Sequence, residues 1–411
     1  MTNTTDRIKA PTRRRAGILA AALLTIGILG GLCWWYRPGN AANRYRRMSM
    51  LELNQTLARN PKDALAARTL ALRLAGEGDA GMGEPALRTA LELNPDDPDV
   101  ATGLGELLMS KNRNEEAFQL LKGVTSRFPH YLPGRNALGR LYMRKGSYLH
   151  ASNEYEAILA QEKRDDDSWY QLAVCYLQMQ QSAKAQNAID AALLLQPNDP
   201  HYLALKGSVD VAVGNVSAGI EATRRAAQLA PKNIHILSTL TNLLLTQHRN
   251  EADLDLAEQS IGRLEQLNPD YALLPFQRGE LERVRQHWLP AAHYLEKALV
   301  TSPGQDEVYF SLGQVYRRLN RPQEADKMIQ VFHYRQKLSQ QVDAVRIALG
   351  SHPDDANLYG KLARLQIQLG DQTSALGSVR AGLAIDPKNK DLQRGLEALS
   401  PKTAPGTAPQ P

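Results

Sequence analysis

Apolar residues follow two different patterns along this chain. From Ala16 to Tyr36 the sequence is AGILAAALLTIGILGGLCWWY, in which Thr25 is the only polar side chain. A helix of this length, at about 1.5 Å per residue, reaches roughly 30 Å and can cross a bilayer. From about residue 62 to residue 387, apolar residues recur instead at three- and four-residue spacing, with Gly or Asn between the segments. That periodicity predicts amphipathic helices arranged in pairs.

The end of the apolar run favours a membrane anchor over a cleaved signal peptide. Trp34, Trp35 and Tyr36 close the run, and such rings favour the headgroup layer. A signal peptide has a shorter apolar core followed by small residues, whereas Gly-Asn-Ala at 39–41 makes a poor cleavage site. We therefore predict an uncleaved transmembrane helix over Ala16–Tyr36.

Residues in and beside this span predict its orientation and its contacts. Arg13, Arg14 and Arg15 precede it directly, which favours a cytoplasmic N-terminus and a body outside a bacterial cytoplasmic membrane. Gly27 and Gly31 form G-x-x-x-G, a spacing found at dimerisation faces, although glycine is also common in membrane helices. Self-association through these glycines therefore stays one of two alternatives.

Proline recurs at a fixed interval in the rest of the chain. Successive intervals are 34 residues, apart from one of 38, one of 50 and one slot that lysine occupies. The positions are Pro61, Pro95, Pro129, Lys163, Pro197, Pro231, Pro269, Pro303, Pro353 and Pro387. A period in this range indicates one supersecondary unit stacked many times.

Each unit carries small and aromatic residues at matching places. In one unit Leu138, Gly139 and Tyr142 lie on a first helix, and Ala151 and Tyr155 lie on a second. Later units repeat the pattern with Trp169, Leu172, Tyr176 and Ala185, and with Tyr309, Leu312, Gly313, Tyr316 and Ala325. Together with the terminal proline, this pattern resembles the tetratricopeptide repeat. The resemblance implies an all-α, right-handed solenoid of helix-turn-helix units that binds partners and rarely carries chemistry.

The resemblance and the composition define the expected organisation. About nine repeats with terminal capping helices fill residues 48–399, and the Pro/Thr/Ala-rich end is expected to be disordered. The expected segments are a basic tail over 1–15, the transmembrane helix over 16–36, a basic linker over 37–47, the solenoid over 48–399 and the tail over 400–411.

The chain departs from the regular 34-residue period at three places. Lys163 replaces proline, so the preceding helix is expected to run on toward Asp165. Four extra residues before Pro269 are placed around His248–Ala252. Sixteen extra residues between Pro303 and Pro353 predict either one long helix or two in series, in a degenerate repeat, a hinge or a partner-specific feature.

Charge and cysteine add little to this picture. The net charge is +6, but residues 1–47 carry nine basic groups and one acid, which leaves −2 for the repeating body. A near-neutral body without a basic aromatic face argues against nucleic-acid binding. Cys33 and Cys175 lie in different segments and form no disulfide framework.

No catalytic, cofactor or metal constellation stands out. Gly76-Glu77-Gly78-Asp79-Ala80-Gly81 matches G-x-G-x-x-G, but a helix precedes it where a dinucleotide site needs a strand. Asp165, Asp166 and Asp167 lie at a predicted helix start. Acids at this place cap backbone N–H groups and are stabilised by the positive end of the helix dipole. We therefore predict neither an enzyme nor a metal protein.

The resemblance places the partner groove on the first helices of the repeats. Carried over residue by residue, it gives Asn136, Arg140, Tyr170, Asn242, Phe276, Arg283, Phe310, Gln314, Arg317 and Arg364. Amides can bond an extended peptide backbone, and arginine pairs with acids. The carboxylate clamp of chaperone-binding members is absent, because only Asn136 among the matching positions has a suitable side chain.

The predicted function is a membrane-anchored scaffold that recruits or assembles a protein complex, in secretion or envelope biogenesis. One alternative is a sensor or carrier of a peptide or small ligand, with a closed pocket near residues 303–353. The other is an enzyme or the regulatory subunit of a membrane enzyme.

Overall fold

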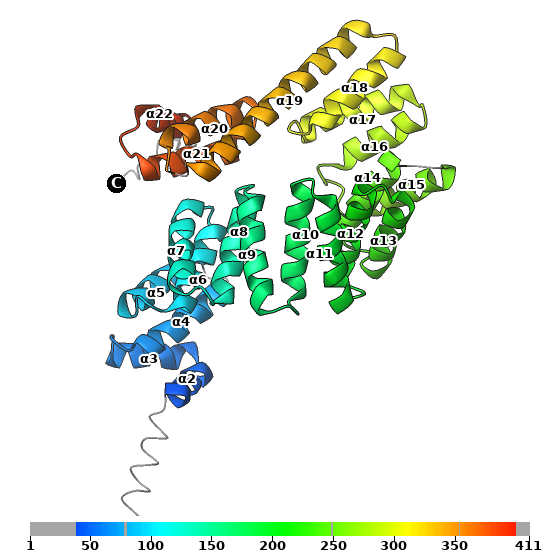
Figure 1. Cartoon of the computed structure of the whole chain (residues 1–411). Coiled ribbons are helices and arrows are strands. Elements are labelled where there is room, and N and C mark those ends of the chain that lie inside the picture. The colour runs from blue at the N-terminus through cyan, green and yellow to red at the C-terminus, as the bar shows by residue number, and fades with distance from the viewer. Residues whose placement is uncertain (1–37, 78–79, 248–249, 353, 400–411) are drawn as a thin grey trace, which may run out of the picture. The chain divides into compact units, whose positions relative to one another are not determined.

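Every regular element that the structure describes is a helix, which confirms the predicted all-α fold (Figure 1). The computed structural model describes residues 38–77, 80–247, 250–352 and 354–399. The predicted transmembrane helix Ala16–Tyr36, with Gly27 and Gly31, lies outside these ranges, as does the tail over 400–411. Within them, no helix combines the length and the apolar character that a bilayer crossing requires.

The chain divides into two compact units, residues 1–107 and residues 108–411. The first unit holds α2 (Pro38–Arg47), α3 (Met50–Arg59), α4 (Ala64–Gly76) and α5 (Ala80–Leu93), and α6 (Pro98–Ser110) crosses the boundary. The second unit begins with α7 (Asn114–Arg127), α8 (Leu132–Arg144), α9 (Tyr148–Gln161), α10 (Asp166–Gln178), α11 (Ser182–Leu195), α12 (Pro200–Ala212) and α13 (Val216–Leu229). It continues with α14 (Ile234–Gln247), α15 (Glu251–Leu267), α16 (Leu274–Val284), α17 (Trp288–Thr301), α18 (Asp306–Arg318), α19 (Pro322–Ser351), α20 (Ala356–Gln368), α21 (Gln372–Ile385) and α22 (Lys390–Leu399).

Helix α2 occupies most of the segment for which we expected a linker. The Tyr45 hydroxyl donates to Asp63 at 2.7 Å, and Arg73 of α4 donates to the backbone carbonyls of Arg46 and Met48 at 3.0 and 2.6 Å. These bonds hold the C-terminal end of α2 against the first repeat. The segment expected to be a basic linker is therefore a helix over residues 38–47, held to α4 and to the turn before it through Tyr45 and two backbone carbonyls.

In seven helix pairs the structure describes the whole inner turn, and each of these turns has one residue with a left-handed backbone. Three of the seven place glycine there, as the sequence pattern suggested, and four use asparagine or glutamine at the same place. The residues are Asn112, Gly146, Gln180, Gly214, Gln286, Asn320 and Gly370, with φ between 58° and 90°. This turn reverses the chain so that the two helices of a pair lie antiparallel.

Helix α9 ends at Gln161 and does not run on toward Asp165. Two side-chain contacts stop it without proline. The Trp169 indole N–H donates to the Lys163 carbonyl at 3.0 Å, and Asp165 caps α10 by accepting from the hydroxyl and backbone N–H of Ser168. Capping was the predicted role of Asp165. The run-on was the wrong prediction, because the cap of the next helix fixes the turn as firmly as proline does.

The extra residues before Pro269 lengthen helices instead of forming a loop. Helix α14 has 14 residues and α15 has 17, compared with 13 and 14 in the pair α10 and α11. The buried alanine of the second helix shows where the insertion lies. It is the fourth residue in α9 and α11 (Ala151, Ala185) and the seventh in α15 (Ala257). Three extra residues therefore form a first turn at the start of α15.

The longest interval contains one continuous helix, α19, of 30 residues. Of the two predicted forms, the single long helix is confirmed. Figure 1 shows it running from beside α18 to beside α20. Its first part packs Ala325 into a cluster with Leu312, and its second part packs Leu338 and Val342 against Leu362.

Arg335 fixes the middle of α19 to its neighbours. Its guanidinium pairs with Asp306 at 2.5 Å and donates to the backbone carbonyls of Gly304 and Leu369, each at 3.1 Å. The side chain is only 12% exposed. Through this one side chain, the middle of α19 is bonded both to the start of α18 and to the end of α20.

Small residues allow the helices of a pair to touch. A Cβ atom on Gly139 would lie 3.0 Å from the Tyr155 ring, as expected for a close-approach position. The tightest contact joins α12 and α13. There a Cβ atom on Gly207 would lie 1.9 Å from the Thr223 hydroxyl and 2.6 Å from the Gly219 carbonyl oxygen.

Substituting Gly207→Ala is expected to lower the free energy of unfolding by about 1–3 kcal/mol, because the methyl group forces α12 and α13 apart. Gly262→Ala in α15 is the control, since nothing lies within 4 Å of its Cβ position. It should be neutral or gain up to about 1 kcal/mol of helix propensity. Urea unfolding followed by circular dichroism measures both, and equal midpoints for the two variants would contradict the packing argument.

Candidate functional site

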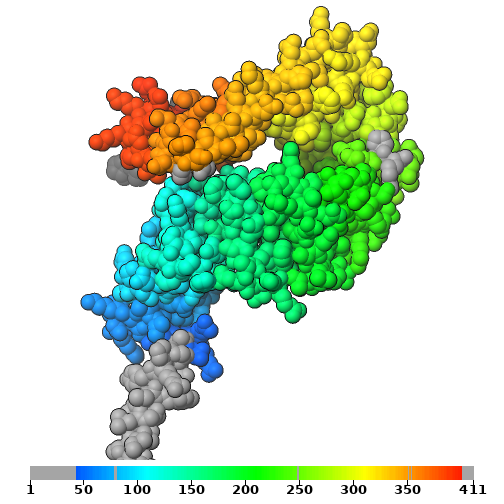
Figure 2. Space-filling model, viewed as in Figure 1, coloured from blue at the N-terminus to red at the C-terminus, as the bar shows by residue number. Residues whose placement is uncertain are grey.

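The first helices of successive pairs contact one another within the second unit. Contacts join α10 to α12, α12 to α14, α14 to α16, and α16 to α18. In Figure 2 the atoms of residues 132–229 form one continuous surface on the face in view. The ten predicted groove residues all lie on first helices, and we call the surface they form the first-helix face. Their role in binding remains a prediction, but the structure describes how each is held.

A buried glutamine ties α14 to α16 beneath this face. The Gln277 amide nitrogen donates to the Ser238 carbonyl at 3.2 Å, to the Ser238 hydroxyl at 2.9 Å and to the Asn242 side-chain oxygen at 2.8 Å. Because a backbone carbonyl only accepts, these contacts orient the amide. Its oxygen is buried without a partner among the described residues, which costs about 1–3 kcal/mol. Asn242 is thus held in a defined rotamer at the face.

An ion pair continues the polar strip from α16 toward α18. The Arg283 guanidinium donates to both carboxylate oxygens of Glu280, at 3.0 and 2.7 Å, and Glu280 is 9% exposed. A longer contact of 3.4 Å joins Arg283 to the side-chain oxygen of Gln314. Because Glu280 is buried and binds Arg283 through two hydrogen bonds, both side chains are held in one arrangement. The free donors of Gln314 remain on the exposed side of the strip.

Aromatic rings lie at two places on the face. Tyr170 stacks on Tyr202 with ring centroids 5.0 Å apart, and Tyr202 donates its hydroxyl to Asp166 at 2.8 Å. Burial raises the pKa of Tyr170, and burial together with the Asp166 hydrogen bond raises that of Tyr202. Both rings are therefore neutral at physiological pH. Phe310 packs against Phe332 of α19 with ring centroids 5.2 Å apart. Phe310 is 41% exposed, so the rest of its ring is accessible to a partner.

The remaining predicted residues are mostly exposed. Arg140, Arg317 and Arg364 are exposed residues, and Asn136 and Phe276 are half-buried. Arg317 makes one exposed pair, with Asp326 at 3.4 Å. Surface pairs of this kind contribute little and exchange easily with another acid. The first-helix face therefore combines fixed amides with cations that a partner can reach.

Residue-by-residue carry-over missed two residues that matter here. Gln277 and Tyr202 fall outside the repeated places from which the groove was derived, yet they hold Asn242 and Tyr170. The only signal in the sequence is a glutamine directly after the apolar residues 272–276. The residues that Gln277 contacts depend on the distance between α14 and α16. The local sequence pattern gives no information on that distance.

Hollows open on the other side of the pairs, between successive second helices. One lies between α9 and α11 and another between α13 and α15. Neither is lined by a residue of 303–353, so neither matches the pocket expected in that segment.

Comparison with known proteins identifies the repeating unit. A sequence profile of the tetratricopeptide repeat matches residues 74–141 and 142–209, and a second profile of the same repeat matches residues 306–330. Residues 74–209 and 306–330 therefore match tetratricopeptide repeats. A tetratricopeptide repeat protein from Parabacteroides merdae superposes with a TM-score of 0.50 at 16% identity, over 60% of this chain and 95% of that one. This likeness supports the repeat fold and says nothing of function.

Curated relatives of the repeats are distant and longer. Cellulose synthase operon protein C of Pseudomonas fluorescens is 25% identical over 84% of this chain and 30% of its own length. BBSome complex member BBS4 of Mus musculus is 26% identical over 32% of this chain and 25% of its own length. The chain spans between a quarter and a third of these two relatives.

Replacing Gln277 tests the tie beneath the repeats' first-helix face. Gln277→Ala should lower the free energy of unfolding by about 1–3 kcal/mol, because it removes the bonds to α14 and leaves a space. Gln277→Met keeps the volume and also removes the unpartnered oxygen, so it should cost less than Gln277→Ala. Urea unfolding of both, beside the exposed control Gln314→Ala, measures this order; the reverse order would show that packing does not govern the site.

Proposed function

We propose that the chain is a scaffold whose first-helix face binds an extended segment of a partner protein. The observation that carries the proposal is the preset position of its amides. Asn242 is held by Gln277, and Gln314 is approached by the fixed Arg283. Amides that are ordered before binding lose little conformational freedom when they bond a peptide backbone.

The charges on this face favour an acidic segment. Arg140, Arg317 and Arg364 are exposed, whereas the acid of the strip, Glu280, is buried and neutralised by Arg283. Guanidinium groups bind carboxylates through two parallel hydrogen bonds. An extended segment with carboxylates spaced along it, and an apolar side chain against Phe310, therefore fits the face best.

The N-terminal sequence and one relative support a place at a membrane. Ala16–Tyr36 has the length and composition of a single span, with the repeat body proposed to lie outside the cytoplasm of a bacterial cell. One relative, cellulose synthase operon protein C, is named for a cellulose synthase operon. We therefore propose that the scaffold assembles a protein complex in the cell envelope.

The proposal predicts that the triple variant Arg140→Ala, Asn242→Ala and Arg317→Ala loses peptide binding at least tenfold. The probe is a set of acidic extended peptides selected on the full-length chain from a randomised phage-displayed library. Fluorescence anisotropy measures their affinity, and circular dichroism checks that the helices persist.

A matched triple variant on the second helices serves as the control. Asn153→Ala, Lys297→Ala and Arg380→Ala also remove one amide and two cations from exposed positions. This variant should bind the selected peptides like the unmodified chain. Equal affinity of the two triple variants would move the binding surface away from the first-helix face.

A further inference from the structure

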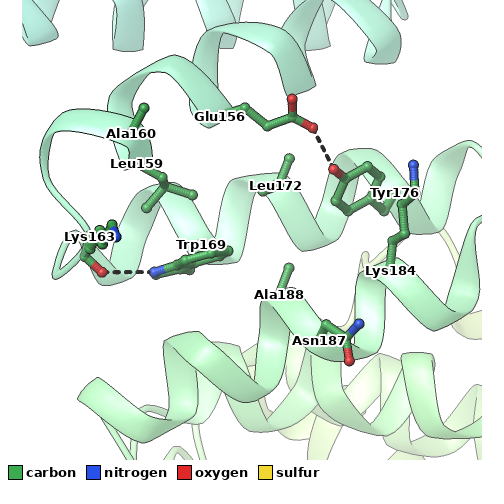
Figure 3. A pocket seen from close by; sticks show the side chains of 10 residues that line it. All are labelled: Glu156, Leu159, Ala160, Lys163, Trp169, Leu172, Tyr176, Lys184, Asn187 and Ala188. Atoms are coloured by element: carbon green, nitrogen blue, oxygen red, sulfur yellow. Dashed lines mark hydrogen bonds between the residues drawn. The ribbon is translucent and has the colours of Figure 1, made fainter.

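A hollow on the opposite side of the repeats has the features of a second binding site. It lies between the second helices α9 and α11, over α10, and has a volume of about 620 Å³ (Figure 3). That volume falls within the range of ligand pockets, roughly 300–1,000 Å³. Leu159, Leu172 and Ala188 line it and are at most 5% exposed, so it has an apolar floor.

Two aromatic side chains of α10 form walls that are locked in place. The Trp169 indole N–H donates to the Lys163 carbonyl at 3.0 Å, and the Tyr176 hydroxyl donates to Glu156 at 2.5 Å. Both hydrogen bonds are drawn in Figure 3. Burial and the Glu156 hydrogen bond raise the pKa of Tyr176 to about 12, so its hydroxyl keeps its proton at physiological pH. An occupant would meet ring faces that need no reordering.

Two lysines at this hollow lack a carboxylate partner. In the described part of the chain neither Lys163 nor Lys184 makes an ion pair, and the Lys184 amine lies 5.2 Å from the Tyr176 ring centroid. Glu156 is the only acidic residue in the lining, and its carboxylate already accepts a hydrogen bond from the Tyr176 hydroxyl. The lining side chains therefore carry a net charge of +1, which suits an acidic occupant.

The same architecture recurs 140 residues later with its charge reversed. There Tyr316 donates to Glu296 at 2.9 Å and Tyr309 to the Pro303 carbonyl at 3.2 Å. Glu324 stands in the place of Lys184 and pairs with Arg321. The charged residues at the positions that correspond to the lining of the hollow, Glu296, Glu324 and Lys327, carry a net −1.

The counterpart also explains the empty space between α9 and α11. Where the hollow has Ala160 and Ala188, the counterpart has Val300 and Met328. Met328 packs against the apolar cluster of its own repeat. Val300 is 82% exposed, so the comparison singles out position 188. The hollow is thus the volume left by the small side chain of Ala188, beside rings that hold their positions.

We infer that this hollow binds a second peptide class, a segment in which a large apolar side chain is flanked by carboxylates. The apolar side chain lies on Leu159 and Leu172 between the two rings, and the carboxylates meet Lys163 and Lys184. Such a segment can be bound while the first-helix face is occupied, because the residues that form the two surfaces do not overlap. One chain would then join two partners.

The test uses the full-length chain in a mild detergent and a fluorescein-labelled peptide, Gly-Asp-Leu-Phe-Asp-Gly, with blocked ends. Two variants copy the counterpart site: Lys184→Glu and Ala188→Met. Each should raise the dissociation constant at least tenfold, through charge reversal in the first and filling of the hollow in the second. Lys184 is exposed, so Lys184→Glu keeps the test valid if the buried Ala188→Met disturbs folding.

Controls separate this site from the first-helix face. Lys297→Glu, the same charge change on another second helix, should bind like the unmodified chain, as should the triple variant Arg140→Ala, Asn242→Ala and Arg317→Ala. A twin peptide with lysine for both aspartates should bind at least tenfold more weakly. The inference is wrong if the peptide does not bind the unmodified chain, if the two hollow variants bind it normally, or if the first-helix triple variant abolishes binding.

Discussion

The need of each helix pair to bury apolar surface against its neighbours governs the rest of this structure. A single pair cannot cover its own apolar faces, so burial requires stacking. The cluster that contains Leu203, Ile220, Leu240, Ile261 and Leu281 runs through α12 to α16 without a break. Small residues at the contact between the helices of a pair make this stacking close, and Gly207 against Gly219 is its tightest point.

Close stacking has different consequences on the two sides of the repeats. First helices touch one another, so a polar group at that contact depends on a neighbouring repeat for its hydrogen bonds, as the Gln277 amide nitrogen depends on Ser238 and Asn242. Between second helices, the space depends on the side chains of two repeats, and alanine at position 188 leaves a hollow. The same constraint thus produces an ordered polar face on one side and an apolar recess on the other.

The irregular segments follow the same rule. The insertion before Pro269 and the long interval before Pro353 are both absorbed as helix, since added turns keep the backbone hydrogen-bonded and leave the buried faces in register. In α19 the extra residues give roughly 24 Å of helix at about 1.5 Å per residue. Arg335 fixes that length at its middle through Asp306 and two backbone carbonyls.

Periodicity alone was sufficient to predict the all-α repeat fold, the pairing of helices and the phase of each unit, because these depend on which residues lie on one helical face. It also predicted the close approach at Gly139 and the cap at Asp165. Tertiary structure decided that α9 ends at Gln161, that residues 38–47 pack as α2, that Gln277 holds Asn242, and that a hollow opens beside Trp169. Each of these depends on distances between elements that are far apart in the chain. A local sequence pattern shows which residues lie on one face of a helix. The distance between two helix faces depends instead on every side chain that packs between them.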